Sequence, residues 1–257
     1  IQTVIDIVGL DVLDYAQIRQ WVSDFASIMS NFAGDEAIIR QGKQSVQQFI
    51  DYVQERLHQL RHTPDASVLG KLVAHAGHHL TDAELVDSAR VIIFGGVETT
   101  SALIVNALYC LLTHPDQLEA VRNDPDNLLP NAIEEALRYE SPVQTCTRHV
   151  LQDVEVAGVK LQRGDTLQCM LGAANRDPAH YDKPDQFDIY RPNAGDHLAF
   201  ANGKHYCIGA GLARMEAITS LKMLLDAFPN MKLGNPETDI PVGYEFRSPH
   251  HLHVAIQ

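Results

Sequence analysis

Cysteine is scarce in this sequence, and basic residues are outnumbered by acidic ones. Only four cysteines occur in 257 residues, and no two of them form a Cys-x-x-Cys pair. This count and spacing exclude a thiolate zinc site and a disulfide framework as the basis of the fold, and they favour the reducing cytosol. The net charge of −13 argues against nucleic-acid and anionic-membrane partners, because both need clustered Lys and Arg.

Long apolar runs are missing too, and the N-terminus shows no signal-peptide pattern. We expect no membrane-spanning helix, because that needs about 20 consecutive apolar residues. The chain starts with Ile1 rather than Met, which indicates a processed or trimmed piece of a longer protein. Its length is sufficient for one large domain with a useful core.

The first half has apolar residues at helical spacing, which predicts helices over 14–32 and 45–60. Three histidines, His75, His78 and His79, could suggest a metal site. A metal site needs more ligands in a fixed geometry. We therefore interpret this cluster as a solvated helix end.

The clearest helix begins at Thr81, where Glu84 completes a capping box. The sequence then stays apolar and free of proline as far as Leu112, and His114 and Pro115 end it. A helix of this length spans about 45 Å and would be buried on several sides.

Gly95, Gly96, Glu98 and Thr99 interrupt the middle of this apolar helix. Adjacent glycines within a helix cost about 1 kcal/mol each relative to alanine, and a buried Glu is expensive. Residues that are unfavourable in the middle of a buried helix are often kept there for function, so this group suggests a functional site. The alternative is close helix packing at the glycines, with Glu98 reaching solvent.

The second half mixes short helices with short strands, separated by one long irregular segment. We expect helices over 115–122, 130–139 and 207–228, strands over 154–156, 159–161 and 166–171, an irregular segment over 175–192, and a terminal hairpin over 241–256. The fold class is therefore mainly α with small β-sheets.

The segment from Phe200 to Gly209 carries the strongest chemical signal. A glycine-bearing loop runs into a helix, with Cys207 at the junction. Backbone N–H groups at a helix N-terminus would stabilise Cys207 as a thiolate. Gly203 and Gly209 would let the backbone approach a flat, bulky group, against which Phe200 could pack. The alternative is a buried cysteine at a helix start with no ligand. The other three cysteines are expected to be buried fillers.

This segment resembles the haem-binding loop of the cytochrome P-450 family, Phe-x-x-Gly-x-x-x-Cys-x-Gly with a basic residue two before the cysteine. Three further family motifs follow the family's order. The matching residues are Phe200, Gly203, His205, Cys207 and Gly209 for the loop, Glu135 and Arg138 for Glu-x-x-Arg, Arg191 for the meander, and Gly95, Gly96, Glu98 and Thr99 for the long helix.

The resemblance implies haem b as the cofactor, with Cys207 as the thiolate ligand to iron. His205 and Arg148 would hold the haem propionates. Gly95 and Gly96 would leave room for dioxygen, and Glu98 and Thr99 would relay protons during oxygen activation. Glu135, Arg138 and Arg191 would form a buried structural ion triad. For substrate contact, the candidates are Val91, Phe94, Val143, Gln144 and Thr145, for which core packing is the alternative.

The implied activity is that of a soluble, cytoplasmic, bacterial-type haem-thiolate monooxygenase, which inserts one atom of O2 into a small organic substrate. Electrons would come from a separate ferredoxin- or flavodoxin-type donor. The family's N-terminal region has no counterpart here, so we expect a truncated fold, either a fragment or a short natural relative. An open haem edge would let water in and favour leakage of peroxide. A non-catalytic haem-binding remnant and a peroxide-driven enzyme are the alternatives.

The expected organisation is one haem-binding domain. Its parts are a helical region over 1–80, the long helix over 81–113, helices, sheets and meander over 114–199, the ligand loop and its helix over 200–228, and a terminal hairpin over 229–257.

Overall fold

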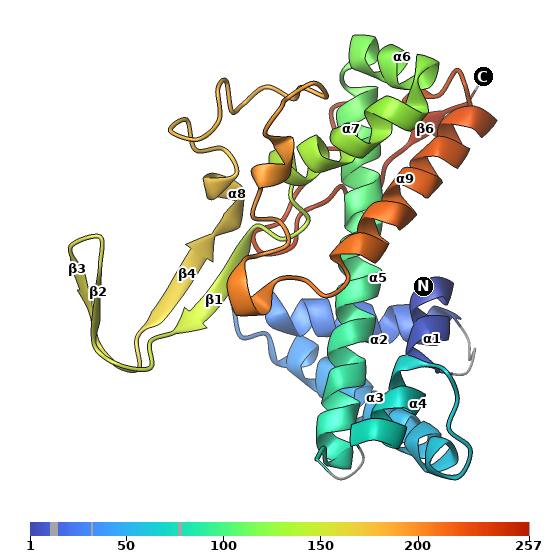
Figure 1. Cartoon of the computed structure of the whole chain (residues 1–257), viewed down its shortest axis with the longest axis vertical. Helices are drawn as coiled ribbons and strands as arrows, with labels where there is room; N and C mark the ends of the chain where they lie inside the picture. Colours follow the sequence, from blue (N-terminus) through green and yellow to red (C-terminus); the bar gives the residue numbers. More distant parts are fainter. Residues whose placement is uncertain (11–14, 32, 77–78, 257) are drawn as a thin grey trace. The chain divides into compact units, whose positions relative to one another are not determined.

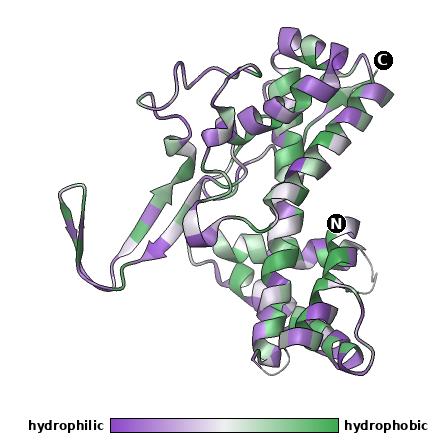
Figure 2. Ribbon diagram, viewed as in Figure 1, coloured by the Kyte–Doolittle hydropathy of each residue, from purple (hydrophilic) through white to green (hydrophobic). Residues whose placement is uncertain are grey.

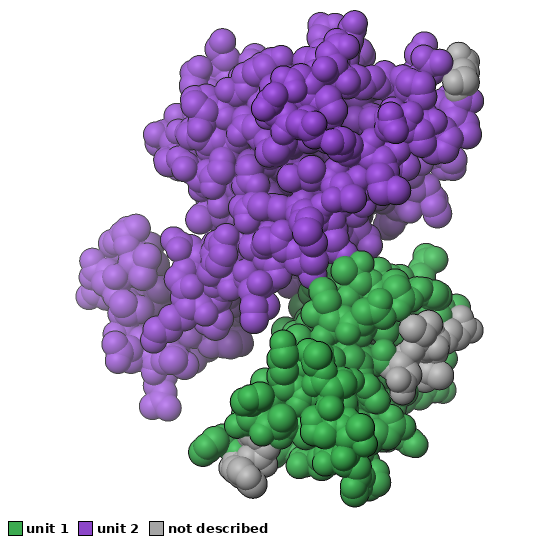
Figure 3. Space-filling view, turned by 45° about the vertical axis from the view of Figure 1, so that its right-hand side comes forward, with its two compact units in different colours: residues 1–99 green, residues 100–257 purple. Residues whose placement is uncertain are grey.

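A computed structural model describes residues 1–10, 15–31, 33–76 and 79–256, and the chain divides into two compact units (Figure 3). Unit 1 is Ile1–Thr99 and unit 2 is Thr100–Gln257. Of the three clustered histidines, His78 lies outside the described residues.

Unit 1 is helical. It contains α1 (Gln2–Val8), α2 (Tyr15–Met29), α3 (Glu36–His62), α4 (Val68–Ala76) and the first part of α5 (Asp82–Leu112) (Figure 1). The two helices expected here are confirmed, but α3 is longer at both ends than 45–60. It begins early because the Asp35 carboxylate accepts a hydrogen bond from the Ala37 N–H at 2.7 Å, which caps the helix. In the core, Trp21 and Phe25 pack edge-on against Phe49.

The long helix α5 is confirmed with the expected cap. Thr81 N–H donates to Glu84 Oε2 at 2.7 Å, and Glu84 N–H donates to Thr81 Oγ1 at 3.3 Å. We expected no segment able to span a membrane. This expectation is wrong, because α5 is long enough and apolar enough to cross one. This is weak evidence for a membrane span, since the core helices of water-soluble proteins pass the same test. Hydrophobic residues follow much of α5 (Figure 2).

Unit 2 continues with α6 (Pro115–Asn123) and α7 (Pro125–Tyr139). The predicted start of α7 at Pro130 is wrong: Pro125 occupies the first turn and Pro130 lies inside the helix. At this position a proline removes one helical hydrogen bond, and its ring crowds the carbonyl four residues earlier. The buried side chains of Leu129 and Ile133, on either side of Pro130, hold this turn in the core.

Three two-stranded antiparallel sheets occur among the described residues of unit 2. They pair β1 (Thr145–His149) with β4 (Thr166–Met170), β2 (Val154–Val156) with β3 (Val159–Leu161), and β5 (Lys232–Leu233) with β6 (Val254–Ala255). The expected terminal hairpin over 241–256 is confirmed only in its first part, where Val242 and Ser248 form an antiparallel bridge. The strand β6 at its end pairs with β5 instead. An alternating pattern predicts an extended strand but does not identify its partner.

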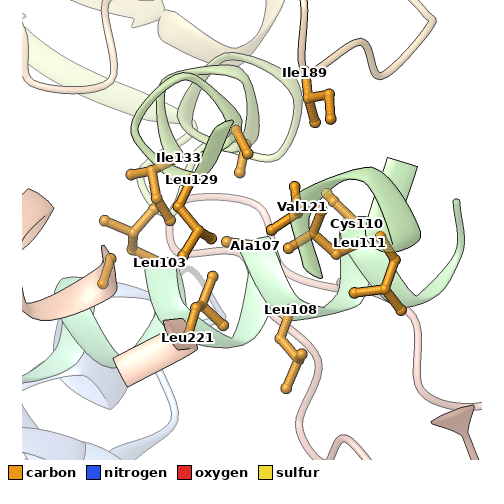
Figure 4. Packing of buried hydrophobic residues seen from close by; sticks show 14 of the residues in the cluster. Leu103, Ala107, Leu108, Cys110, Leu111, Val121, Leu129, Ile133, Ile189 and Leu221 are labelled. Atoms are coloured by element: carbon orange, nitrogen blue, oxygen red, sulfur yellow. The ribbon is translucent and has the colours of Figure 1, made fainter. Parts of the chain in front are cut away.

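The core of unit 2 forms where α5, α7 and α9 (Ala210–Ala227) meet. Figure 4 shows Leu103 of α5 packed with Leu129 and Ile133 of α7, with Leu221 of α9 close by. A short helix, α8 (Leu171–Ala174), follows β4. The chain is therefore mainly helical with small sheets, as expected.

Candidate functional site

Cys207 lies at the end of a closed loop, three residues before the start of α9 at Ala210. Its N–H donates to Phe200 O at 3.0 Å, which closes the loop, and its carbonyl accepts from Ala210 N–H at 3.3 Å. The expectation that α9 begins at Cys207 is wrong, because the helix begins three residues later at Ala210, with Gly209 as its N-cap. Gly203 turns the loop with φ of 69°, a conformation that favours glycine.

The thiol side of this loop is exposed. Cys207 and His205 are both exposed, and Ile208 is 96% exposed. The alternative of a buried cysteine is therefore wrong. Phe200, the first residue of the loop, is half-buried and packs against the core of unit 2.

A cluster of charged residues contacts the loop, and it was not predicted from the sequence. The Glu134 carboxylate on α7 accepts from Arg214 Nε at 2.6 Å and Nη2 at 2.8 Å, and His197 Nε2 lies 3.2 Å away. The Arg214 guanidinium stacks over the Phe200 ring at 4.5 Å, and interaction with Tyr206 helps to raise the pKa of Arg214. These contacts tie both ends of the loop to α7 and α9.

The charges in this cluster are strongly coupled. Burial raises the pKa of Glu134, but hydrogen bonds and charge from Arg214 and His197 outweigh it and bring the pKa to about 2. Glu134 therefore stays ionised at neutral pH. Arg214 lies four residues, about one helical turn, after the start of α9 at Ala210. Its pairing with Glu134 depends on the packing of α9 against α7, so no local signal in the sequence indicated it.

Glu135, Arg138 and Arg191 meet in one buried triad. Arg138 donates to both Glu135 oxygens at 2.7 and 2.8 Å, and Arg191 Nε lies 3.1 Å from each. Glu135 and Arg138 are completely buried. The remaining guanidinium donors bond backbone carbonyls of the irregular segment: Arg138 to Asn175, Pro184 and Gln186, and Arg191 to Asp182, Lys183 and Gln186.

The other candidates in unit 2 lie on or next to β1. Arg148 is half-buried and donates to Thr147 O at 2.9 Å. Thr145 is buried, and its hydroxyl accepts from Gln168 at 2.6 Å. Its side chain is thus engaged within the sheet.

Val143 and Gln144 precede β1. Val143 forms a bridge with Phe246, and Gln144 donates from Nε2 to Ser141 O at 2.7 Å. Both are half-buried. Gln144 also receives the Gly172 N–H on its backbone oxygen at 3.0 Å, which joins the start of β1 to α8.

The candidate residues on α5 lie in unit 1. The two glycines among them, Gly95 and Gly96, differ in how closely other residues approach them. A Cβ on Gly96 would meet Val4 Cγ2 of α1 at 2.9 Å, whereas a Cβ on Gly95 would meet nothing within 4 Å. Gly96 thus fits the close-packing interpretation, and Gly95 is open. The Thr99 hydroxyl donates to Gly95 O.

Glu98 is half-buried, and burial raises its pKa. The substrate candidates Val91 and Phe94 lie one to two turns earlier on α5. Val91 is 67% exposed and Phe94 is half-buried. Val91 is therefore not a core residue of unit 1.

A model of the cytochrome P450 family matches residues 36–241. "Putative cytochrome P450 140" of Mycobacterium bovis is 42% identical over 195 residues, which are 74% of this chain and 44% of that protein. The "Biotin biosynthesis cytochrome P450" of Bacillus subtilis is 34% identical over 254 residues, 98% of this chain and 63% of that protein.

Solved structures agree with these relatives. P450BioI, in complex with an acyl carrier protein ligated with hexadec-9Z-enoic acid, matches with a TM-score of 0.91 at 32% identity, covering 100% of this chain and 65% of that one. Cytochrome P450 CREJ, in complex with (4-ethylphenyl) dihydrogen phosphate, matches with a TM-score of 0.92 at 29% identity, covering 99% and 64%. The chain thus spans less than two thirds of the length of these relatives.

Proposed function

Because the chain belongs to the cytochrome P450 family, we propose that it is the haem-binding part of a haem-thiolate monooxygenase, with Cys207 as the ligand to iron. The observation that supports this best is the exposed Cys207 thiol, held at the junction of a closed loop and α9. Such a position leaves the sulfur accessible to a large group while the backbone around it is anchored.

The residues present fit a haem. Exposed Ile208 offers an apolar surface beside the thiol. A Cβ added at Gly203 would meet no atom within 4 Å. One added at Gly209 would lie 3.9 Å from Cys207 Sγ, an ordinary van der Waals distance. The backbone at both glycines therefore does not crowd the sulfur. Among the residues that the structure describes, no cluster of three or more His, Cys, Asp or Glu could hold a metal ion. A haem iron needs only one protein thiolate here, because the porphyrin supplies four nitrogen ligands.

When bound, the haem supplies oxygen activation, which thiolate ligation favours by donating electron density. Cys207 would hold the iron, and Phe200, Gly203 and Gly209 would shape the loop around the macrocycle. His205, which is exposed, and Arg148, which is half-buried, would bind the propionates through charge-assisted hydrogen bonds.

Glu98 and Thr99 would move protons. The raised pKa of Glu98 lets its carboxyl hold a proton to higher pH than an exposed Glu, so the side chain can act as a donor. The Thr99 hydroxyl donates to Gly95 O, and it must give up this bond to pass its proton elsewhere. Open space at Gly95 would accommodate dioxygen beside this pair, with Gly96 packing α5 onto α1.

The substrate we propose is a small, largely apolar organic molecule, in keeping with Val91 and Phe94 on α5 and with Val143, Gln144 and Thr145 at β1. Electrons would come from a separate ferredoxin- or flavodoxin-type donor.

The test is the absorption spectrum of the purified chain, reconstituted with haem, reduced with dithionite and exposed to carbon monoxide. A strongly red-shifted Soret band is expected. Cys207→Ala should abolish this band, whereas Cys169→Ser, which changes another exposed cysteine, should retain it. A Soret band typical of neutral ligation in the unchanged chain would contradict the proposal.

Measuring product formation under two conditions distinguishes the oxygen-dependent reaction from the peroxide-driven one. Product that forms with O2 and a reduced ferredoxin, and that is lost in Glu98→Gln, supports the proton relay. Product that forms only with added peroxide, equally in both proteins, would contradict it.

A further inference from the structure

Two cysteines outside the proposed haem site lie directly opposite each other. In the antiparallel pair of β1 and β4, Cys146 is the register partner of Cys169. Both thiols are free, Cys169 is exposed and Cys146 is half-buried. The expectation that all cysteines other than Cys207 are buried fillers is therefore wrong for these two, although it is confirmed for Cys110.

The pairing places the two residues within the separation that a disulfide needs. Val150 N–H donates to Asp165 O at 2.9 Å, and hydrogen-bonded pairs alternate along an antiparallel ladder, so Cys146 and Cys169 form a hydrogen-bonded pair. Cα atoms in such pairs are about 5.5 Å apart, and disulfides span about 4.4–6.8 Å between Cα atoms. Opposite residues also point to the same face of the sheet. Bond formation therefore needs only a small approach of the two Cβ atoms.

A positive charge lies on the same face. Arg148 is two residues after Cys146 on β1, so both side chains leave the strand on one side. Burial raises the pKa of Cys146 and the neighbouring Cys169 adds to this, whereas Arg148 lowers the pKa. Arg148 only partly offsets the other two effects, so the pKa of Cys146 stays above its ordinary value, which suits Cys146 to react second, after the exposed Cys169 has been oxidised.

We propose that Cys146 and Cys169 are a redox modification site, which hydrogen peroxide or a low-molecular-weight disulfide converts into an intramolecular disulfide. This inference needs no haem and does not rest on the proposed function. The link would join β1 to β4 beside Arg148 and so restrict the movement of the strand that carries this arginine.

The chemistry balances with hydrogen peroxide as the oxidant. The exposed Cys169 thiolate attacks one peroxide oxygen, the O–O bond breaks, and a sulfenic acid forms as hydroxide leaves and takes up the thiol proton as water. The Cys146 thiolate then attacks the sulfenic sulfur and expels a second hydroxide, which leaves as water with the Cys146 proton. Two thiols are oxidised to one disulfide, and one peroxide is reduced to two waters.

The test treats the full chain with hydrogen peroxide, blocks remaining thiols with N-ethylmaleimide under denaturing conditions, and maps peptides by mass spectrometry. We expect one disulfide between the Cys146 and Cys169 peptides, a mass loss of about 2 Da from two hydrogens, and full reversal by dithiothreitol. Buried Cys110 should stay reduced and be alkylated. Repeating the experiment in Cys207→Ala excludes scrambling through the exposed Cys207.

A single-thiol variant gives the matched control. In Cys146→Ser, the Cys169 thiol has no partner and should proceed to sulfinic acid at a peroxide dose that leaves the unchanged chain in the disulfide form. The proposal is overturned if Cys169 reaches sulfinic acid equally fast in both proteins, or if it links mainly to Cys207 or to a second molecule.

Discussion

Replacing Glu135 with Gln should destabilise unit 2 more than any surface charge change, because Glu135 holds two buried arginines. Its carboxylate accepts hydrogen bonds from Arg138 and Arg191 and from the Asp188 N–H at 2.9 Å. Glutamine has almost the same volume, but its amide group points N–H donors at guanidinium donors and removes the negative charge. Two guanidinium groups would then keep their charge in the core without that partner.

Removing one member of a buried ion pair costs about 3–5 kcal/mol, a large part of the about 5–15 kcal/mol that stabilises a typical domain. With a urea m-value of about 1–3 kcal/mol per molar, the unfolding midpoint should fall by roughly 2 M. The assay is urea unfolding followed by far-UV circular dichroism. Fluorescence of Trp21, the only tryptophan, reports on unit 1 separately.

Asp126→Asn is the matched control. Asp126 pairs with Lys222 at the surface, where its side chain is 77% exposed, and such pairs contribute about 0.2–1 kcal/mol. Equal midpoints for Glu135→Gln and Asp126→Asn would refute the view that the triad is a buried, charge-dependent support.

Two further predictions concern stability. Because the pKa of Glu134 is about 2 in the folded chain and 4.5 is its ordinary value, its ionisation should contribute about 3 kcal/mol above pH 4.5, lost as the pH falls toward 2. Glu134→Gln should flatten this part of the pH profile of urea unfolding, and an unchanged profile would contradict the assignment. On α5, Gly95→Ala should raise the melting temperature, since it gains up to about 1 kcal/mol of helix propensity. Gly96→Ala should lower it, because its Cβ meets Val4, and equal shifts would rule out this packing difference.

Local signals in the sequence predicted the elements that depend on neighbours along the chain. Thr81 and Glu84 marked the start of α5, since a capping box is a contact within four residues. The loop before Cys207 was predicted for the same reason, because Gly203 and the helix that follows fix its course.

Features that depend on distant residues were not predictable. Glu134 and Arg214 meet only after α7 and α9 pack together, and their separation of 80 residues leaves no local trace. Within the expected terminal hairpin over 229–257, the pairing of β5 with β6 was not predicted, because an alternating pattern does not identify the partner of a strand. The start of α7 was placed too late because a proline inside a helix and a proline at its first position look alike in sequence.

The irregular segment over 175–192 has consequences for the order of folding. Arg138 binds carbonyls 37 to 48 residues later in the chain, so the segment cannot acquire its shape from local contacts. Contacts across such separations form late, after the loop between them has closed. During synthesis, Glu135 and Arg138 on α7 leave the ribosome before the segment that carries Arg191 and these carbonyls. The triad is therefore complete only when the chain as far as Arg191 has been synthesised, and until then the Arg138 guanidinium lacks its backbone partners in the segment.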